Sequence, residues 1–191
     1  MFNTLKHRIR RRMALMRSNF GSRCVQSPYA WQFINDVLSN RTPYHAYADL
    51  KEQLRALSRR NRKIAKMLLR LANYLQPATA WLPGEYKDFA PFVERGCSRT
   101  AVQIMPAGSR AKGQYPKSDV QCPMSTVITF YDAEGNTSAI VVLGLDSTAA
   151  TIANWRTLQA SPWATLTFDL GHTGVILVNN AYTKQHYNVN V

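Results

Sequence analysis

Residues 63–97 read KIAKMLLRLANYLQPATAWLPGEYKDFAPFVERGC, and the character of this 191-residue chain changes within them. The first part has apolar residues every three or four positions, which is typical of an amphipathic helix, and Pro77 stops it. After the proline, short apolar segments alternate with proline and glycine, which is typical of strands and turns. The sequence therefore predicts helices before this stretch and a sheet after it, which is an α/β fold.

Positive charge is concentrated before the change. Residues 1–70 hold 16 Lys/Arg against 3 Asp/Glu, whereas residues 71–191 hold 8 of each, so the first part carries the whole net charge of +13. A basic segment on a neutral body indicates a polyanionic partner, either nucleic acid or an anionic lipid surface. A solubilising helical surface is the alternative. The cations predicted for this contact are Lys6, Arg8, Arg10, Arg11, Arg12 and Arg17, with a second cluster at Arg59, Arg60, Arg62 and Lys63 in the region 59–70.

The cysteines and the hydropathy limit the class of protein. Cys24, Cys97 and Cys122 are widely spaced and form no C-x-x-C pair, so neither a disulfide framework nor a metal site is indicated, and a cytoplasmic location is predicted. The longest apolar run, 139–145, is too short to cross a bilayer, and we find no secretory signal. No catalytic motif is present, and His172, in a predicted strand turn, is the histidine that we would mutate if activity were found.

The chain divides into a basic helical segment, 1–76, and an α/β domain, 77–191. Three short strands close the chain, and their spacing predicts an antiparallel meander. The segment 100–105 fits a helix or a strand, and 106–123 is predicted to be a polar loop. The predicted helices cover 5–17, 28–40, 47–57, 61–76 and 147–161, and the predicted strands cover 78–82, 125–131, 139–145, 164–169, 174–178 and 186–191.

A glycine and an acid after residue 77 suggest part of a nucleotide-binding pattern. In such a domain the first strand leads into a glycine-rich turn that opens a helix, and the second strand ends on an acid. Residues 78–82 fit the first strand, Gly84 the first glycine, and 92–94 a second strand that ends on Glu94. No second glycine follows Gly84 at the required distance, and ten positions are too few for a helix and its connections. We therefore predict that the first crossover helix is absent or reduced to a turn.

Several runs carry a resemblance to a known family. VQSPYAWQFINDVL (25–38), PYHAYADLKEQLR (43–55) and KIAKMLLRLANYLQPATAW (63–81) resemble the N-terminal half of a class I S-adenosylmethionine-dependent methyltransferase-like family of Bacteroidetes. AIVVLGLDSTAATIANWRTLQASPWATLTFDLGHTGVILV (139–178) and KQHYNVNV (184–191) are similar to its last strand–helix–strand and closing hairpin.

The resemblance implies a reduced Rossmann-like methyltransferase sheet, with a basic helical N-terminal segment and a C-terminal antiparallel hairpin. It also implies S-adenosylmethionine as the cofactor, with Gly84, Glu94 and Asp132 as its ligands. This chain departs from the family pattern where Leu82 replaces the first acid and Pro83 follows it. A proline removes a backbone donor from the turn that should hold the cofactor. The combined prediction is a degenerate family member without efficient cofactor binding, which acts as an interaction module.

Two alternatives stay open. One is an active class I methyltransferase of unknown acceptor, and the other is a binder of nucleic acid or an anionic surface through the basic helices. Glu94 fits a surface acid beside Arg95 equally well, and Asp132 fits a residue that opens a turn. A shortened sheet would leave an exposed edge, which pairing into a homodimer would cover.

Overall fold

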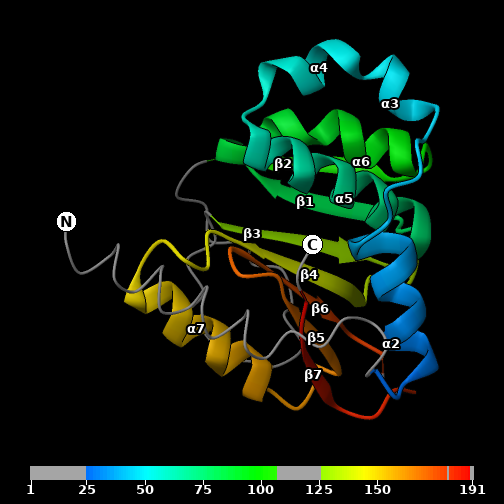
Figure 1. Ribbon diagram of the computed structural model, residues 1–191. Helices are drawn as coiled ribbons and strands as arrows, with labels where there is room; N and C mark the ends of the chain where they lie inside the picture. The colour runs from blue at the N-terminus through cyan, green and yellow to red at the C-terminus, as the bar shows by residue number, and fades with distance from the viewer. Residues whose placement is uncertain (1–24, 107–125, 180, 190–191) are drawn as a thin grey trace.

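The computed structural model describes residues 25–106, 126–179 and 181–189. It is a mixed α/β structure with one seven-stranded sheet, so the predicted α/β class is confirmed (Figure 1). The strands are β1 (Thr79–Pro83), β2 (Ala101–Met105), β3 (Val127–Tyr131), β4 (Thr137–Leu143), β5 (Leu166–Asp169), β6 (Thr173–Leu177) and β7 (Gln185–Asn188). The helices are α2 (Pro28–Phe33), η2 (Ile34–Leu38), α3 (Ala46–Asp49), α4 (Lys51–Ala56), α5 (Arg59–Leu75), η3 (Gly84–Phe89), α6 (Ala90–Gly96) and α7 (Ala149–Ala160).

The strand order is β2-β1-β3-β4-β6-β5-β7. Only β1/β2 and β5/β7 pair in parallel, and the other four pairs are antiparallel. A doubly wound nucleotide-binding sheet is mostly parallel, so the reduced Rossmann-like sheet stays a prediction that this topology does not confirm. The predicted antiparallel pairing of 164–169 with 174–178 is confirmed, since β5 and β6 pair in this way. The predicted meander and closing antiparallel hairpin are wrong for β7, because β7 lies beyond β5 at the edge of the sheet and pairs with it in parallel.

A helical crossover joins β1 to β2. Residues 92–94, which we predicted as a second strand, lie in α6, and the second strand is instead β2. The predicted loss of the crossover helix is therefore wrong, since η3 and α6 fill the connection. Phe89, Phe92 and Val93 are all buried at helical spacing, and a proline sits in the first turn of α6. These features favour a helix over a strand at this point.

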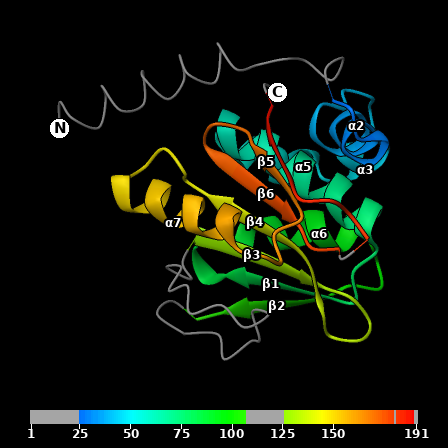
Figure 2. The same ribbon diagram turned by 90° about the horizontal axis from the view of Figure 1, so that it is seen from below.

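Each face of the sheet has its own helical cover (Figure 2). Alternate residues of a strand face opposite sides, so on β4 Val141 packs into the larger core with α2, η2, α5 and α6, while Val142 packs into a smaller core under α7. The ring of Phe33 on α2 lies 4.8 Å from that of Phe168 on β5, centroid to centroid. Helices α2, η2 and α5 thus bury their apolar faces in the same core as the sheet.

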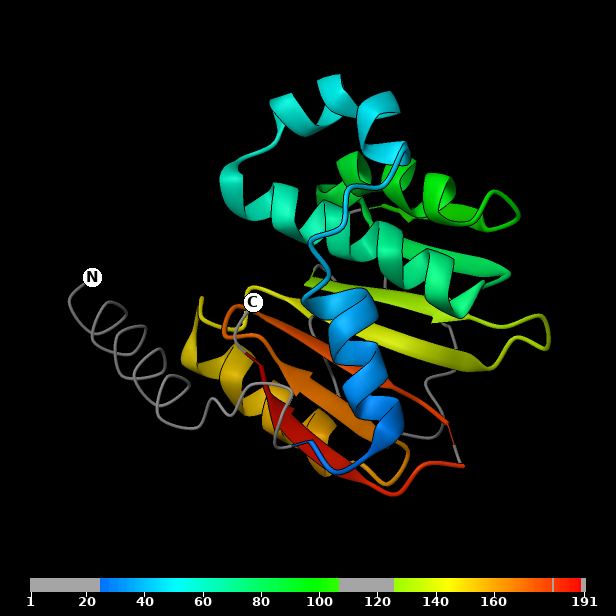
Figure 3. The same ribbon diagram turned by 45° about the vertical axis from the view of Figure 1, so that its right-hand side comes forward.

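Helix α5 runs through the larger core. Ser58 caps it by accepting a hydrogen bond from the backbone N–H of Asn61 at 3.2 Å, so the helix begins at Arg59, two residues before the predicted start at 61. It ends where Gln76 adopts a left-handed conformation ahead of Pro77. Gly96 of α6 lies so close that a methyl group there would be 2.9 Å from the Cβ of Ala72. Figures 1 and 3 show α3 and α4 stacked outside α5 and α6.

The smaller core is centred on Trp155 of α7, which is 1% exposed. Its ring lies over Gly174 of β6, and its Nε1 donates a hydrogen bond to the Asp169 carboxylate at 3.2 Å. Thr148 caps α7 by accepting from the N–H of Thr151 at 3.0 Å. These contacts fix the β5–β6 hairpin, whose turn borders the site described next.

Candidate functional site

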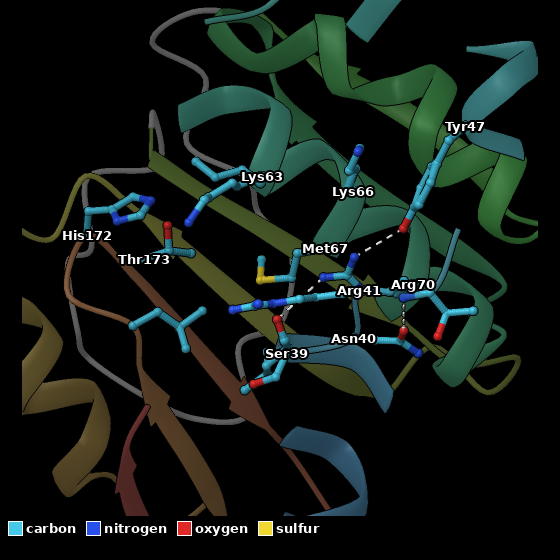
Figure 4. Close-up of a pocket in the computed structure, with 14 residues that line it drawn as sticks. Ser39, Asn40, Arg41, Tyr47, Lys63, Lys66, Met67, Arg70, His172 and Thr173 are labelled. Atoms are coloured by element: carbon cyan, nitrogen blue, oxygen red, sulfur yellow. Dashed lines mark hydrogen bonds between the residues drawn. The ribbon is translucent and has the colours of Figure 1, made fainter. Parts of the chain in front are cut away.

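A pocket of about 480 Å³ opens between the 39–42 connection, helix α5 and the β5–β6 turn (Figure 4). Because these segments are far apart in the sequence, only the folded chain assembles it. The described residues that line it are Leu38, Ser39, Asn40, Arg41, Thr42, Tyr47, Lys63, Ile64, Lys66, Met67, Arg70, Leu170, His172 and Thr173.

The pocket is strongly basic. Lys63, Lys66 and Arg70 come from α5 at positions i, i+3 and i+7, which lie on one face of a helix. Arg41 comes from the preceding connection and extends across the middle of the pocket in Figure 4. None of the described lining residues is an Asp or a Glu. Four cations without a lining carboxylate create a positive potential that attracts anions.

Arg70 lies at the base of the pocket and is only 7% exposed. Its Nε donates to the carbonyl oxygen of Val37 at 2.6 Å, and its Nη2 donates to that of Leu38 at 3.4 Å. These carbonyls end η2, a turn of π-helix in which the Ser39 N–H bonds to the Ile34 carbonyl at 2.7 Å. In the part of the chain that the structure describes, no carboxylate forms an ion pair with Arg70.

Tyr47 connects two of the cations. Its hydroxyl accepts a hydrogen bond from Nη1 of Arg70 at 3.1 Å, and the ammonium of Lys66 lies 4.8 Å from the centre of its ring. A cation over an aromatic face is held by the ring quadrupole. Tyr47 therefore orients Lys66 and Arg70 without neutralising either charge.

His172 forms the wall opposite Arg70. The β5–β6 turn holds it, because Gly171 takes a φ of +88° and the His172 carbonyl accepts from the Leu145 N–H at 3.0 Å. Burial lowers the pKa of His172 below its usual value, and the nearby Arg60 lowers it further. The Asp146 carboxylate opposes this effect, and Lys63 adds a smaller lowering effect. The imidazole is therefore neutral at pH 7 and adds no charge to the pocket.

Thr173, the next residue, begins β6 and is 1% exposed. Its hydroxyl oxygen is buried and has no hydrogen-bond partner among the described residues. In Figure 4 this hydroxyl lies on the same side of the pocket as His172 and the amine of Lys63. A buried hydroxyl without a partner is rare and indicates a missing ligand or water.

The four residues of the second predicted basic cluster, Arg59, Arg60, Arg62 and Lys63, make different contacts. Arg62 donates from Nε to the Leu57 carbonyl at 2.9 Å and from Nη2 to the Arg55 carbonyl at 3.3 Å, so it caps the end of α4. Arg60 pairs with Asp146 at 3.8 Å. Lys63 lines the pocket, and Arg59 is exposed. The first predicted cluster, Lys6, Arg8, Arg10, Arg11, Arg12 and Arg17, lies outside the described residues.

The residues predicted to bind a cofactor are spread over the sheet. Gly84 follows the carboxyl end of β1, whereas Asp132 lies beyond its amino end, since Tyr131 pairs with Thr79. Five residues of strand separate them by roughly 16 Å. Asp132 accepts hydrogen bonds from the N–H groups of Glu134 and Asn136 at 2.9 and 2.8 Å, as a turn-opening residue does.

Glu94 is exposed in the last part of α6 and does not end a strand. The structure therefore does not bring Gly84 and Asp132 together, and it puts Glu94 on a helix surface.

Sequence reasoning missed Arg41 and Thr173 as site residues, and it covered Lys66 and Arg70 only as part of the basic region 59–70. The signal for the cations of α5 was the 63–66–70 spacing, and Arg70 between Leu69 and Leu71 marks a charge on the buried side of the helix. For Thr173 there was no signal, because an unpartnered hydroxyl is visible only in three dimensions.

No family model, curated protein or solved structure matches this chain. The methyltransferase-like resemblance therefore stays a prediction. In the part of the chain that the structure describes, no group of three His, Cys, Asp or Glu side chains is arranged to hold a metal ion. Within the same ranges no helix has both the length and the apolar character needed to cross a bilayer.

Proposed function

We propose that the protein binds nucleic acid through the basic pocket between α5 and the 39–42 connection. The observation that supports this proposal is the gathering of Arg41, Lys63, Lys66 and Arg70 around one hollow whose described lining holds no carboxylate. Phosphate backbones are recognised by such clusters of Lys and Arg, which release condensed counterions on binding. The net charge of +13 adds long-range attraction to a polyanion.

The concave shape of the basic pocket favours nucleic acid over a membrane surface as the partner. Binding to anionic lipid needs cations on a face that can lie flat on the headgroups, or an amphipathic helix whose apolar face enters them. Here Arg70 is buried and Lys66 is half-buried over Tyr47, so a phosphate must come to them. A single phosphate of a flexible strand can enter such a hollow.

The test is fluorescence anisotropy with single-stranded RNA and DNA of about 16 nucleotides, labelled on an internal base, over a range of salt concentrations. We expect binding that weakens steeply with salt, and a Lys63→Gln/Lys66→Gln variant that binds more weakly, with a slope reduced by about 2. The matched control is Lys51→Gln/Lys87→Gln, which removes two exposed charges outside the pocket and should keep the slope.

The proposal is wrong if the unaltered protein binds neither oligonucleotide, or if the control variant loses as much affinity as the pocket variant. Binding to phosphatidylserine vesicles with no binding to oligonucleotides would favour the anionic-surface alternative and overturn the proposal.

The degenerate methyltransferase-like module and the active methyltransferase both stay predictions, as do the homodimer and the cytoplasmic location. No observation on the described residues favours them over nucleic-acid binding. Titration calorimetry with S-adenosylmethionine tests the first two directly: micromolar binding that Glu94→Ala abolishes would support an active cofactor site.

A further inference from the structure

The charge of Arg70 is only partly compensated inside the protein. A guanidinium has five N–H donors, and the described hydrogen bonds use three, all to uncharged oxygens. Two of those oxygens are carbonyls at the end of η2, which carry partial negative charge but no formal charge. A buried cation whose described partners are all uncharged destabilises the fold unless an anion approaches it.

The unpartnered hydroxyl of Thr173 is an independent sign of a missing ligand. It comes from β6, whereas Arg70 comes from α5, and both line the same pocket. Leaving a buried hydroxyl without a hydrogen bond has a free-energy cost that a bound acceptor would remove. The side chains of Arg70, Lys66 and Thr173 all offer donors, so the complementary ligand is an anion with several acceptor oxygens.

We infer that the pocket binds a terminal phosphate group of the nucleic acid, with Arg70 as its buried anchor and Thr173 as a second contact. This inference rests on the proposed function. An internal phosphodiester carries one negative charge and two free oxygens. A terminal phosphomonoester carries close to two charges at pH 7 and three free oxygens, which match four cations and a hydroxyl better.

The experiment compares oligonucleotides that differ only at one end. Anisotropy is measured with the same internally labelled strand carrying a 5′-phosphate, a 3′-phosphate or hydroxyls at both ends. We expect a phosphate at one end to tighten binding about tenfold, which is the effect of one added charge-assisted hydrogen bond. Inorganic phosphate should compete with the phosphorylated strand and much less with the hydroxyl-ended one.

Thr173→Val gives a sharp test because it keeps the shape of the side chain. The hydroxyl has no described partner to lose, so the variant should be at least as stable as the unaltered protein while most of the end preference disappears. Thr137→Val is the matched control, since its hydroxyl is also buried without a described partner and lies outside the pocket lining. It should keep the tenfold preference.

Arg70→Lys keeps the positive charge and removes the planar fork, so it should also reduce the preference. If circular dichroism shows that the Arg70→Lys variant does not fold, the inference is tested by the Thr173→Val variant alone. Equal binding of phosphorylated and hydroxyl-ended strands would overturn the inference and leave the proposed function standing. Failure of every strand to bind would overturn both, and a preference that survives in Thr173→Val and in a folded Arg70→Lys would place the terminal phosphate elsewhere.

Discussion

Replacing Gly174 by alanine should be among the most damaging small changes in this protein. The added methyl carbon would lie 2.6 Å from Cη2 and Cζ3 of Trp155 and 2.9 Å from its Cε3. Ordinary carbon contacts begin at about 3.5 Å, so three ring atoms would overlap the methyl group by several tenths of an ångström or more. The ring cannot withdraw easily, because it is 1% exposed and its Nε1 is bonded to Asp169.

Overpacking of a core usually lowers the free energy of unfolding by about 1–3 kcal/mol. Because the Trp155 ring is buried and hydrogen-bonded to Asp169, we expect the loss for Gly174→Ala to be at the upper end, about 3 kcal/mol. For a chain of this size that free energy corresponds to a melting temperature lower by about 6–12 °C. The assay is urea and thermal unfolding followed by far-ultraviolet circular dichroism. Gly135→Ala is the control: no atom lies within 4 Å of its new methyl group, and its φ of +80° should cost only about 1 kcal/mol.

A double variant tests the cause. Trp155→Phe removes the ring atoms nearest Gly174, so Gly174→Ala should be less harmful in that background, with a coupling free energy of about 1–2 kcal/mol. Additive effects of the two substitutions, or a loss below about 1 kcal/mol for Gly174→Ala alone, would refute the steric argument.

Two further predictions concern stability. Burial lowers the folded-state pKa of both His172 and His186, with help from Arg60 and Lys63 in the first case and from Lys184 in the second. The unfolded chain therefore binds more protons below about pH 6.5, so unfolding free energy should fall as pH decreases through that value, and His172→Gln should flatten the profile in denaturant titrations. Thr148→Ala should lower the unfolding free energy by about 1 kcal/mol through loss of the α7 cap, and an unchanged urea midpoint would contradict this assignment.

Local patterns predicted the helices and most strands because each carried its own period. The apolar face of α5 and the apolar run of β4 follow helical and strand patterns within a few residues, and both elements are confirmed. Residues 92–94 were misread because a short apolar run fits a strand or a helix equally well. The deciding contact, α6 against α5 at Gly96, is distant in sequence.

The pairing of strands was less predictable than their positions. The short connection before β7 favours an antiparallel neighbour, yet β7 lies beside β5, where Tyr187 stacks on Phe168 at 5.4 Å. The candidate site was predictable in charge but not in composition. The second basic cluster pointed to α5, whereas the pocket also needs Arg41 and the β5–β6 turn, which only tertiary folding brings to the helix.

The contact between Phe33 and Phe168 has a consequence for folding during synthesis. Helix α2 is made early, but the ring on which it packs is made 135 residues later, and β7, which borders the same strand, is the last of the described strands. Contacts so distant in sequence close late and slow folding. While synthesis continues, the apolar face of α2 has no partner in β5, so this contact can form only after β5 has left the ribosome.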